Sequence, residues 1–132
     1  MIVALDPGKN IGVAFVNAQG KLVYRTILTL NELKLLLIPA GVTVVVGDGT
    51  GTKEVQRVLR ERALAFAVVD ESGSSLEGRE LYFRENPPRG LQRLLPPGMR
   101  TPLDLIDDYA AYALALRYLK LQASKPKKRS GL

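Results

Sequence analysis

The order of the apolar segments limits the possible folds of this chain more strongly than any other feature. Three strand-like segments follow each other closely, at residues 2–5, 11–16 and 21–28. Turn-forming residues at 7–10 and 17–20 separate them, and the second turn has the composition of a hairpin. Strands joined by such short turns pair antiparallel, so the sequence predicts a three-stranded meander at the start of the chain.

The rest of the chain alternates between helical and strand patterns. We expect a helix at 31–38 with Asn31 as its N-cap, a strand at 42–46, a helix at 52–64, a strand at 65–69, a helix from Ser74 or Ser75 towards Arg84, a proline-rich loop at 86–102 and a last helix at 103–121. Strands joined through helical crossovers lie parallel. The predicted fold is therefore α/β: a mixed five-stranded sheet, made of the meander and two parallel strands and flanked by helices, in the RNase H-like arrangement.

Length and composition fit one small domain. The 132 residues, 46% of them hydrophobic, are enough to bury a core, and we expect a domain at 1–123 followed by a flexible basic tail at 124–132. No apolar run approaches the roughly 18 residues of a membrane span, and the N-terminus begins as a strand rather than as a signal peptide. We therefore expect a cytoplasmic protein without a membrane partner.

Histidine and cysteine are both absent from the sequence. Their absence excludes disulfides, thiolate metal sites and a histidine general base. Any metal ion must then be held by oxygen ligands, which favours hard cations such as Mg²⁺ or Mn²⁺.

Positive charge is in excess, with 19 basic against 13 acidic residues and a net charge of +6. It is concentrated in the tail at 124–129 and in four arginines of the segment before the last helix, namely Arg84, Arg89, Arg93 and Arg100. Such charge suits a nucleic-acid partner, but a solvated tail and a solubilising loop explain it equally well.

Acidic residues stand where the predicted strands end and where the last helix begins. Asp6 ends the first strand, Glu71 follows the last strand, and Asp107 and Asp108 lie in the last helix. Sites in open α/β sheets lie beyond the carboxyl ends of the strands, so these carboxylates can converge on one or two metal ions. Each also has an ordinary explanation, as a turn former, a loop acid or a residue favourable to the helix dipole.

Four short motifs occur in order along residues 1–120. They are LDPGKNIGVA at 5–14, VVGDGT at 45–50, VDE at 69–71 and IDDYAA at 106–111. These motifs resemble those of the RuvC and YqgF resolvase-like families, and the segment at 87–111 is similar to a YqgF-like bacterial branch. The resemblance implies a metal-dependent nuclease that acts on branched DNA, like a Holliday-junction resolvase, or that processes a ribosomal RNA precursor in ribosome biogenesis.

The resemblance also suggests which residues act. It implies Asp6, Glu71 and Asp107 as catalytic residues, and these three with Asp108 as ligands of Mg²⁺ or Mn²⁺. Asp107 is favoured over Asp108 because it matches the single aspartate of YqgF proteins, and adjacent helical residues point about 100° apart. The chain departs from the families in having Asp48-Gly49 in the second motif and Ser72-Gly73 after the Asp-Glu pair.

Several residues near these motifs are candidates for contact with nucleic acid. They are Gly8, Lys9, Gly49, Thr50, Arg89 and Arg93. The glycines would let a phosphate backbone approach, although turn geometry alone also explains Gly8. The segment at 47–53 lacks the Gly-Lys-Ser/Thr ending of a P-loop, so we reject that type of nucleotide site.

Two other functions remain open. The chain would be a catalytically silent nucleic-acid-binding protein if the divergent motifs no longer support catalysis. It would be an ATP-binding module of the actin and sugar-kinase type if the opening motif binds nucleotide, although those proteins need two such domains. DNA or RNA, endonuclease or exonuclease, and monomer or homodimer are not distinguished by the sequence.

Overall fold

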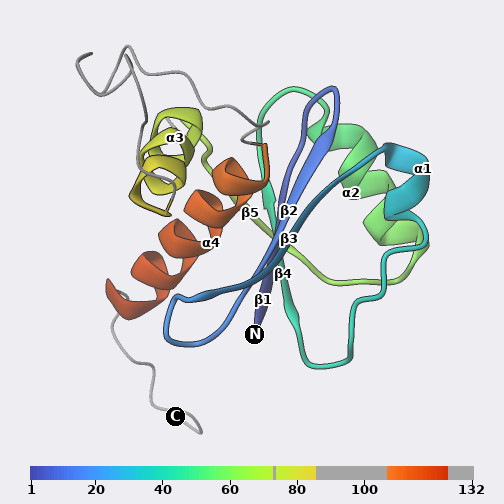
Figure 1. Ribbon diagram of the computed structural model, residues 1–132. Coiled ribbons are helices and arrows are strands. Elements are labelled where there is room, and N and C mark those ends of the chain that lie inside the picture. The colour runs from blue at the N-terminus through green and yellow to red at the C-terminus, as the bar shows by residue number, and fades with distance from the viewer. Residues whose placement is uncertain (73, 86–106, 125–132) are drawn as a thin grey trace, which may run out of the picture.

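A mixed sheet lies between two layers of helices in the computed structural model, which describes residues 1–72, 74–85 and 107–124 (Figure 1). The elements are β1 (Ile2–Asp6), β2 (Ile11–Val16), β3 (Leu22–Leu28), α1 (Leu30–Leu33), β4 (Thr43–Gly47), α2 (Thr52–Glu61), β5 (Ala67–Val69), α3 (Ser74–Glu85) and α4 (Asp107–Ser124). Their order confirms the predicted succession of three strands followed by helices and strands in alternation.

The sheet has the strand order β3-β2-β1-β4-β5. β1 pairs antiparallel with β2, and β2 pairs antiparallel with β3, so the predicted meander is confirmed. The hairpin turn is fixed by Asn17, whose Oδ1 accepts hydrogen bonds from the N–H groups of Gln19 at 3.0 Å and Lys21 at 2.9 Å. β1 and β4, and then β4 and β5, pair in parallel, as expected of strands joined through helices.

Alternating side chains of the strands enter two separate cores. Ala4 and Val45 belong to the core beneath α3 and α4, whereas Leu5 and Val46 belong to the core beneath α1 and α2. We call the side of the sheet that carries α3 and α4 the α4 face. Because side chains of a strand alternate between its two sides, each residue of β1 and β4 can be assigned to one face.

Two helices end earlier than their sequence patterns predict. α1 begins after Thr29, which forms a capping box with Glu32, so the prediction of Asn31 as N-cap is wrong. The helix stops after one turn, and the segment that follows sends Leu36 and Ile38 into the core while Leu35 and Leu37 face solvent. This alternation buries part of Leu36 and Ile38 without a helix to residue 38, and it leaves Leu35 and Leu37 exposed.

α2 buries the predicted face of Val55, Val58 and Leu59 but ends at Glu61 rather than at residue 64. Ala63 has a φ of 57°, a left-handed conformation that ends a helix. The next strand starts at Ala67, two residues later than predicted. The predicted loop at 86–102, the predicted helix start at 103–106 and the tail at 125–132 lie outside the described residues.

α4 crosses the sheet and brings its alanines close to neighbouring backbone. Ala111 and Ala113 are buried in the core of the α4 face, where their small side chains let the helix approach the sheet closely. Ala110 instead meets α3, since a Cβ atom on Gly78 would lie only 2.7 Å from the Ala110 nitrogen. The Tyr112 hydroxyl donates to the Gly20 carbonyl at 2.9 Å and ties the helix to the β2–β3 hairpin. None of the helices in the described ranges is long and apolar enough to cross a membrane.

Candidate active site and metal centre

The carboxyl ends of the three parallel strands lie at one edge of the sheet. Asp6 is the last residue of β1 and Gly47 is the last residue of β4. The register pairs Leu5 with Val46, so Asp6 and Gly47 lie side by side. Both belong to the α4 face, because each stands two residues after a residue of that core. The structure therefore places Asp6 at the strand edge where sites of open α/β sheets are found.

Glu71 brings a second carboxylate to the same place. Its oxygen atoms lie so close to Gly47 and Gly49 that a Cβ atom on either glycine would overlap them. The Cδ1 atom of Leu114 in α4 is 3.1 Å from the position of a Cβ on Gly47. The Glu71 carboxylate thus lies on the α4 face over the end of β4, and both glycines are needed to make room for it.

One oxygen of this carboxylate has no hydrogen-bond partner among the residues that the structure describes. Glu71 Oε1 is buried and accepts no hydrogen bond from the described residues. A buried carboxylate oxygen without a donor is costly unless a proton or a cation compensates it. Its chemistry, a hard oxygen ligand beside the strand end that carries Asp6, fits a divalent cation such as Mg²⁺ or Mn²⁺.

The main chain around Glu71 is held by several side chains. The Glu71 N–H donates to Asp48 Oδ1 at 3.1 Å, and the Ser72 N–H donates to Asp70 Oδ1 at 2.9 Å. Hydrogen bonds from Ser72 lower the pKa of the Asp70 carboxyl below its usual value. Arg117 of α4 donates to the carbonyl groups of Asp70 and Ser72. The position of Glu71 is therefore set by β4, by its own turn and by α4.

Asp108 is engaged elsewhere on the α4 face. Its carboxylate forms an ion pair with Arg25 of β3 at 2.7 Å, and its side chain is 4% exposed whereas that of Arg25 is 44% exposed. The second oxygen accepts the Tyr109 N–H at 2.9 Å, and the Arg25 guanidinium lies 4.9 Å from the centre of the Tyr109 ring. A guanidinium already neutralises this carboxylate, which makes it a weaker candidate for a metal ligand than Glu71.

Asp107 is the first residue of α4, and its side chain lies outside the described part of the structure. Within that part, no group of three or more acidic side chains is arranged to hold a metal ion. The ligand set of Asp6, Glu71 and Asp107, with Asp108 as a further ligand, therefore stays a prediction. The structure itself brings Asp6 and Glu71 to neighbouring strand ends on one face.

Two of the predicted nucleic-acid-binding loops lie against each other at this edge. A Cβ atom on Gly51 would be 3.4 Å from the Gly8 nitrogen, so the β1–β2 turn contacts the β4–α2 loop. Gly8, Lys9 and Thr50 are exposed on these loops, whereas Gly49 is partly covered by Glu71. Arg89 and Arg93 lie outside the described residues, so their predicted role is not tested.

Sequence reasoning did not single out three residues that organise this site. Asp48 appeared only as a departure from a family motif, yet it accepts the Glu71 N–H. Arg25 and Arg117 received no role, although each is a lone charge in an apolar segment, a strand for Arg25 and a helix for Arg117. An isolated arginine in a buried helix usually has an acidic or carbonyl partner, so a signal was available for Arg117, whereas β3 is largely exposed and gave none for Arg25.

The fold places the chain in a recognisable structural class. The mixed sheet of order β3-β2-β1-β4-β5, with helices on both sides, is the RNase H-like α/β fold. A solved structure of Thermus thermophilus RuvC in complex with a Holliday junction substrate is similar to it, with a TM-score of 0.54 and 12% identity over 93% of this chain and 96% of that one.

A second structure of Thermus thermophilus RuvC has a TM-score of 0.49 and 12% identity, over 96% of this chain and 98% of that one. No protein-family model matches the sequence, and no curated protein matches it significantly.

Proposed function

We propose that this protein is a divalent-metal-dependent nuclease whose site is centred on Asp6 and Glu71. The observation that carries the proposal is the Glu71 carboxylate, which lies over the end of β4 beside Asp6 and has a buried oxygen without a partner among the described residues. A catalytic carboxylate held in this way is ready to bind a cation, whereas an ordinary loop acid would point its oxygens to solvent.

Asp6, Glu71 and Asp107 would hold Mg²⁺ or Mn²⁺ through carboxylate oxygens. The bound ion would supply an activated water and stabilise charge on a phosphodiester, which makes a histidine base unnecessary. Asp48 and Ser72 would keep the Glu71 main chain in place. Leu114 of α4 lies close to the same point above Gly47 and would limit the access of bulk water to the carboxylate.

Nucleic acid is the proposed substrate class, and branched DNA the first choice within it. The similar RuvC structure was solved in complex with a Holliday junction substrate. The chain carries a net charge of +6, and exposed Lys9 lies in the turn next to Asp6. The motif resemblance to YqgF proteins makes a ribosomal RNA precursor the alternative substrate, with action in the cytoplasm in either case.

Cleavage of labelled nucleic acids tests this proposal. A four-way DNA junction, a linear duplex of the same sequence and a single-stranded RNA should be compared in Mg²⁺, in Mn²⁺ and in chelator. We expect cleavage of the junction, dependent on the added metal. Preferred cleavage of the RNA would select the alternative substrate. Tight binding of any of them without cleavage in either metal would instead identify a catalytically silent binding protein.

The two adjacent aspartates of α4 should contribute differently. We expect Asp107→Asn to reduce cleavage strongly, because this residue is the proposed third ligand. Asp108→Asn should reduce it much less, since Asp108 is already paired with Arg25. Cleavage rates of the two variants at saturating Mg²⁺ decide this. A larger loss for Asp108→Asn would mean that the ion pair opens and that α4 presents Asp108 to the metal.

A further inference from the structure

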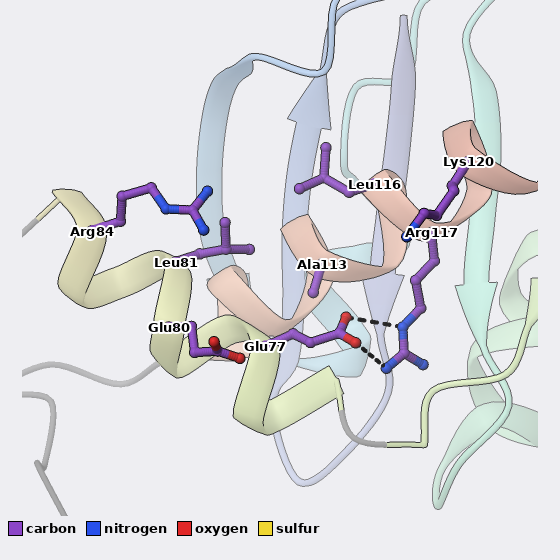
Figure 2. Close-up of a pocket in the computed structure, with 8 residues that line it drawn as sticks. All are labelled: Glu77, Glu80, Leu81, Arg84, Ala113, Leu116, Arg117 and Lys120. Atoms are coloured by element: carbon purple, nitrogen blue, oxygen red, sulfur yellow. Dashed lines mark hydrogen bonds and ion pairs between the residues drawn. The ribbon is translucent and has the colours of Figure 1, made fainter. Parts of the chain in front are cut away.

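Arg117 is the one charged residue between Tyr109 and Leu119 in α4, and its side chain crosses to α3. Its Nε and Nη2 atoms donate to the two carboxylate oxygens of Glu77, at 3.0 and 2.7 Å, as Figure 2 shows. The Glu77 carboxylate raises the pKa of the Arg117 guanidinium above its usual value. Only 22% of the Arg117 side chain is exposed. This ion pair fixes the guanidinium at the junction of α3, α4 and the end of β5.

The same guanidinium also makes two bonds to the main chain beside the candidate site. Nη1 donates to the Asp70 carbonyl at 2.8 Å, and Nη2 donates to the Ser72 carbonyl. These two carbonyl groups belong to the residues before and after Glu71, and the Asp70 carbonyl is part of the peptide group that includes the Glu71 N–H. Asp48 accepts the N–H of the same Asp70–Glu71 peptide group, and the Ser72 N–H of the next peptide group donates to Asp70 Oδ1, so the peptide groups on both sides of Glu71 are fixed.

We propose that Arg117 is the positioning residue for Glu71: it clamps the carbonyl groups of the two residues on either side of Glu71 and thereby holds the Glu71 carboxylate over Gly47 and Gly49. The inference rests on the proposed function, because only the proposed function assigns a metal ion to Glu71. It assigns a role in the site to a residue of α4 that touches neither the metal nor the substrate.

Other roles for Arg117 fit the contacts less well. Arg117 lines a groove of about 400 Å³ between α3 and α4, together with Glu80, Arg84 and Lys120 (Figure 2). Four of the five N–H donors of its guanidinium are already used by Glu77 and by the two carbonyl groups. One free donor is too few for the paired contact that arginine makes with phosphate. The residue is therefore built to hold the protein chain rather than a ligand in the groove.

Manganese affinity, measured by the electron paramagnetic resonance signal of free Mn²⁺, tests this role without any assay of catalysis. We expect Arg117→Met to weaken Mn²⁺ binding by about tenfold or more, in the range typical of residues that support a metal ligand. Glu77→Gln should keep an affinity close to that of the parent, because the arginine can still reach both carbonyl groups. Arg57→Met removes an exposed arginine from α2 and serves as the matched control.

The Glu71→Gln background separates positioning from general damage to the fold. There, Arg117→Met should change Mn²⁺ affinity little, because the carboxylate that it positions has already lost its charge. In the metal-free protein, amide hydrogen exchange at Glu71 and Ser72 should be faster in Arg117→Met than in the control. Arg117→Lys keeps the charge but cannot bridge both carbonyl groups, and it replaces Arg117→Met if that variant does not fold.

The outcomes distinguish the two proposals. Failure of the parent protein to bind Mn²⁺ would overturn the proposed function and this inference together. If Glu71→Gln weakens the Mn²⁺ affinity of the protein but Arg117→Met leaves it unchanged, the inference alone would be overturned. The inference would also be overturned if Arg117→Met weakened Mn²⁺ affinity equally in the parent and in the Glu71→Gln background. The effect of Arg117 would then not depend on the Glu71 carboxylate.

Discussion

Replacement of Asp6 by asparagine is expected to lower the rate of nucleic-acid cleavage by at least about a thousandfold, which corresponds to roughly 4 kcal/mol of transition-state stabilisation. The variant keeps the size and shape of the side chain but removes the charge that the proposed metal site requires. Asp6 stands at the end of β1, next to the β4 end over which the Glu71 carboxylate lies, so its charge is at the centre of the proposed site.

The fold should survive this change. Asp6 and Glu71 bring two negative charges to neighbouring strand ends, and removal of one charge relieves repulsion in the metal-free protein. We therefore expect the thermal unfolding midpoint of Asp6→Asn to equal or exceed that of the parent. Glu61→Gln, which removes an exposed carboxylate at the end of α2, is the matched control and should cleave like the parent. Parental cleavage by Asp6→Asn would exclude Asp6 from the site.

The second large effect is expected on stability, from the ion pair between Arg25 and Asp108. Arg25→Met should destabilise the protein by about 3 kcal/mol, because it leaves the carboxylate of Asp108 buried without its counter-charge. Asp108→Asn should cost less, since the Arg25 side chain is 44% exposed and can be hydrated when its partner is lost. Urea unfolding of the two variants measures the difference.

The double variant Arg25→Met/Asp108→Asn checks the cause of this effect. If the penalty comes from an unpaired buried charge, the double variant should be more stable than Arg25→Met alone. Additive losses would show instead that Arg25 stabilises the protein through its packing on Tyr109. Because this ion pair joins β3 to the first turn of α4, the loss would also loosen the helix that carries Asp107.

The strands could be predicted because their signals are local. β1, β2 and β4 are apolar runs bounded by glycine, proline or asparagine, and the structure reproduces them within one residue at each end. α1 was predicted too long because its leucines fit a helical spacing and an extended alternation equally well. The sequence alone offers no way to decide between them, since the choice depends on which leucines the core can accept.

The site could be predicted only in part, because its geometry depends on contacts between distant residues. The rule that sites lie at the carboxyl ends of parallel strands predicted Asp6 and Glu71, and the structure brings these two residues to neighbouring strand ends. It did not show that the Glu71 carboxylate occupies the space above two glycines of the preceding strand and loop. That contact depends on how far β5 extends beyond β4 and on where α4 crosses the sheet, which no local pattern encodes.

The role of the arginines illustrates the same limit. Arg117 is separated by 40 residues from Glu77 and by 47 from Asp70, and its three partners lie on two different segments. A lone charge in an apolar helix indicates that a partner exists, but not which one. The sequence likewise carries no sign that Asp108 pairs with Arg25, because the two residues are 83 positions apart.

Binding of Mn²⁺ to the metal-free protein is the most direct test of the central claim, that Asp6 and Glu71 together hold a divalent cation. The free-Mn²⁺ signal should be titrated for the parent, Asp6→Asn, Glu71→Gln and the control Glu61→Gln under the same conditions. We expect saturable binding by the parent and by the control, and an affinity weakened at least about tenfold by either site substitution. Absence of saturable binding by the parent, or equal affinity in all four proteins, would contradict this claim.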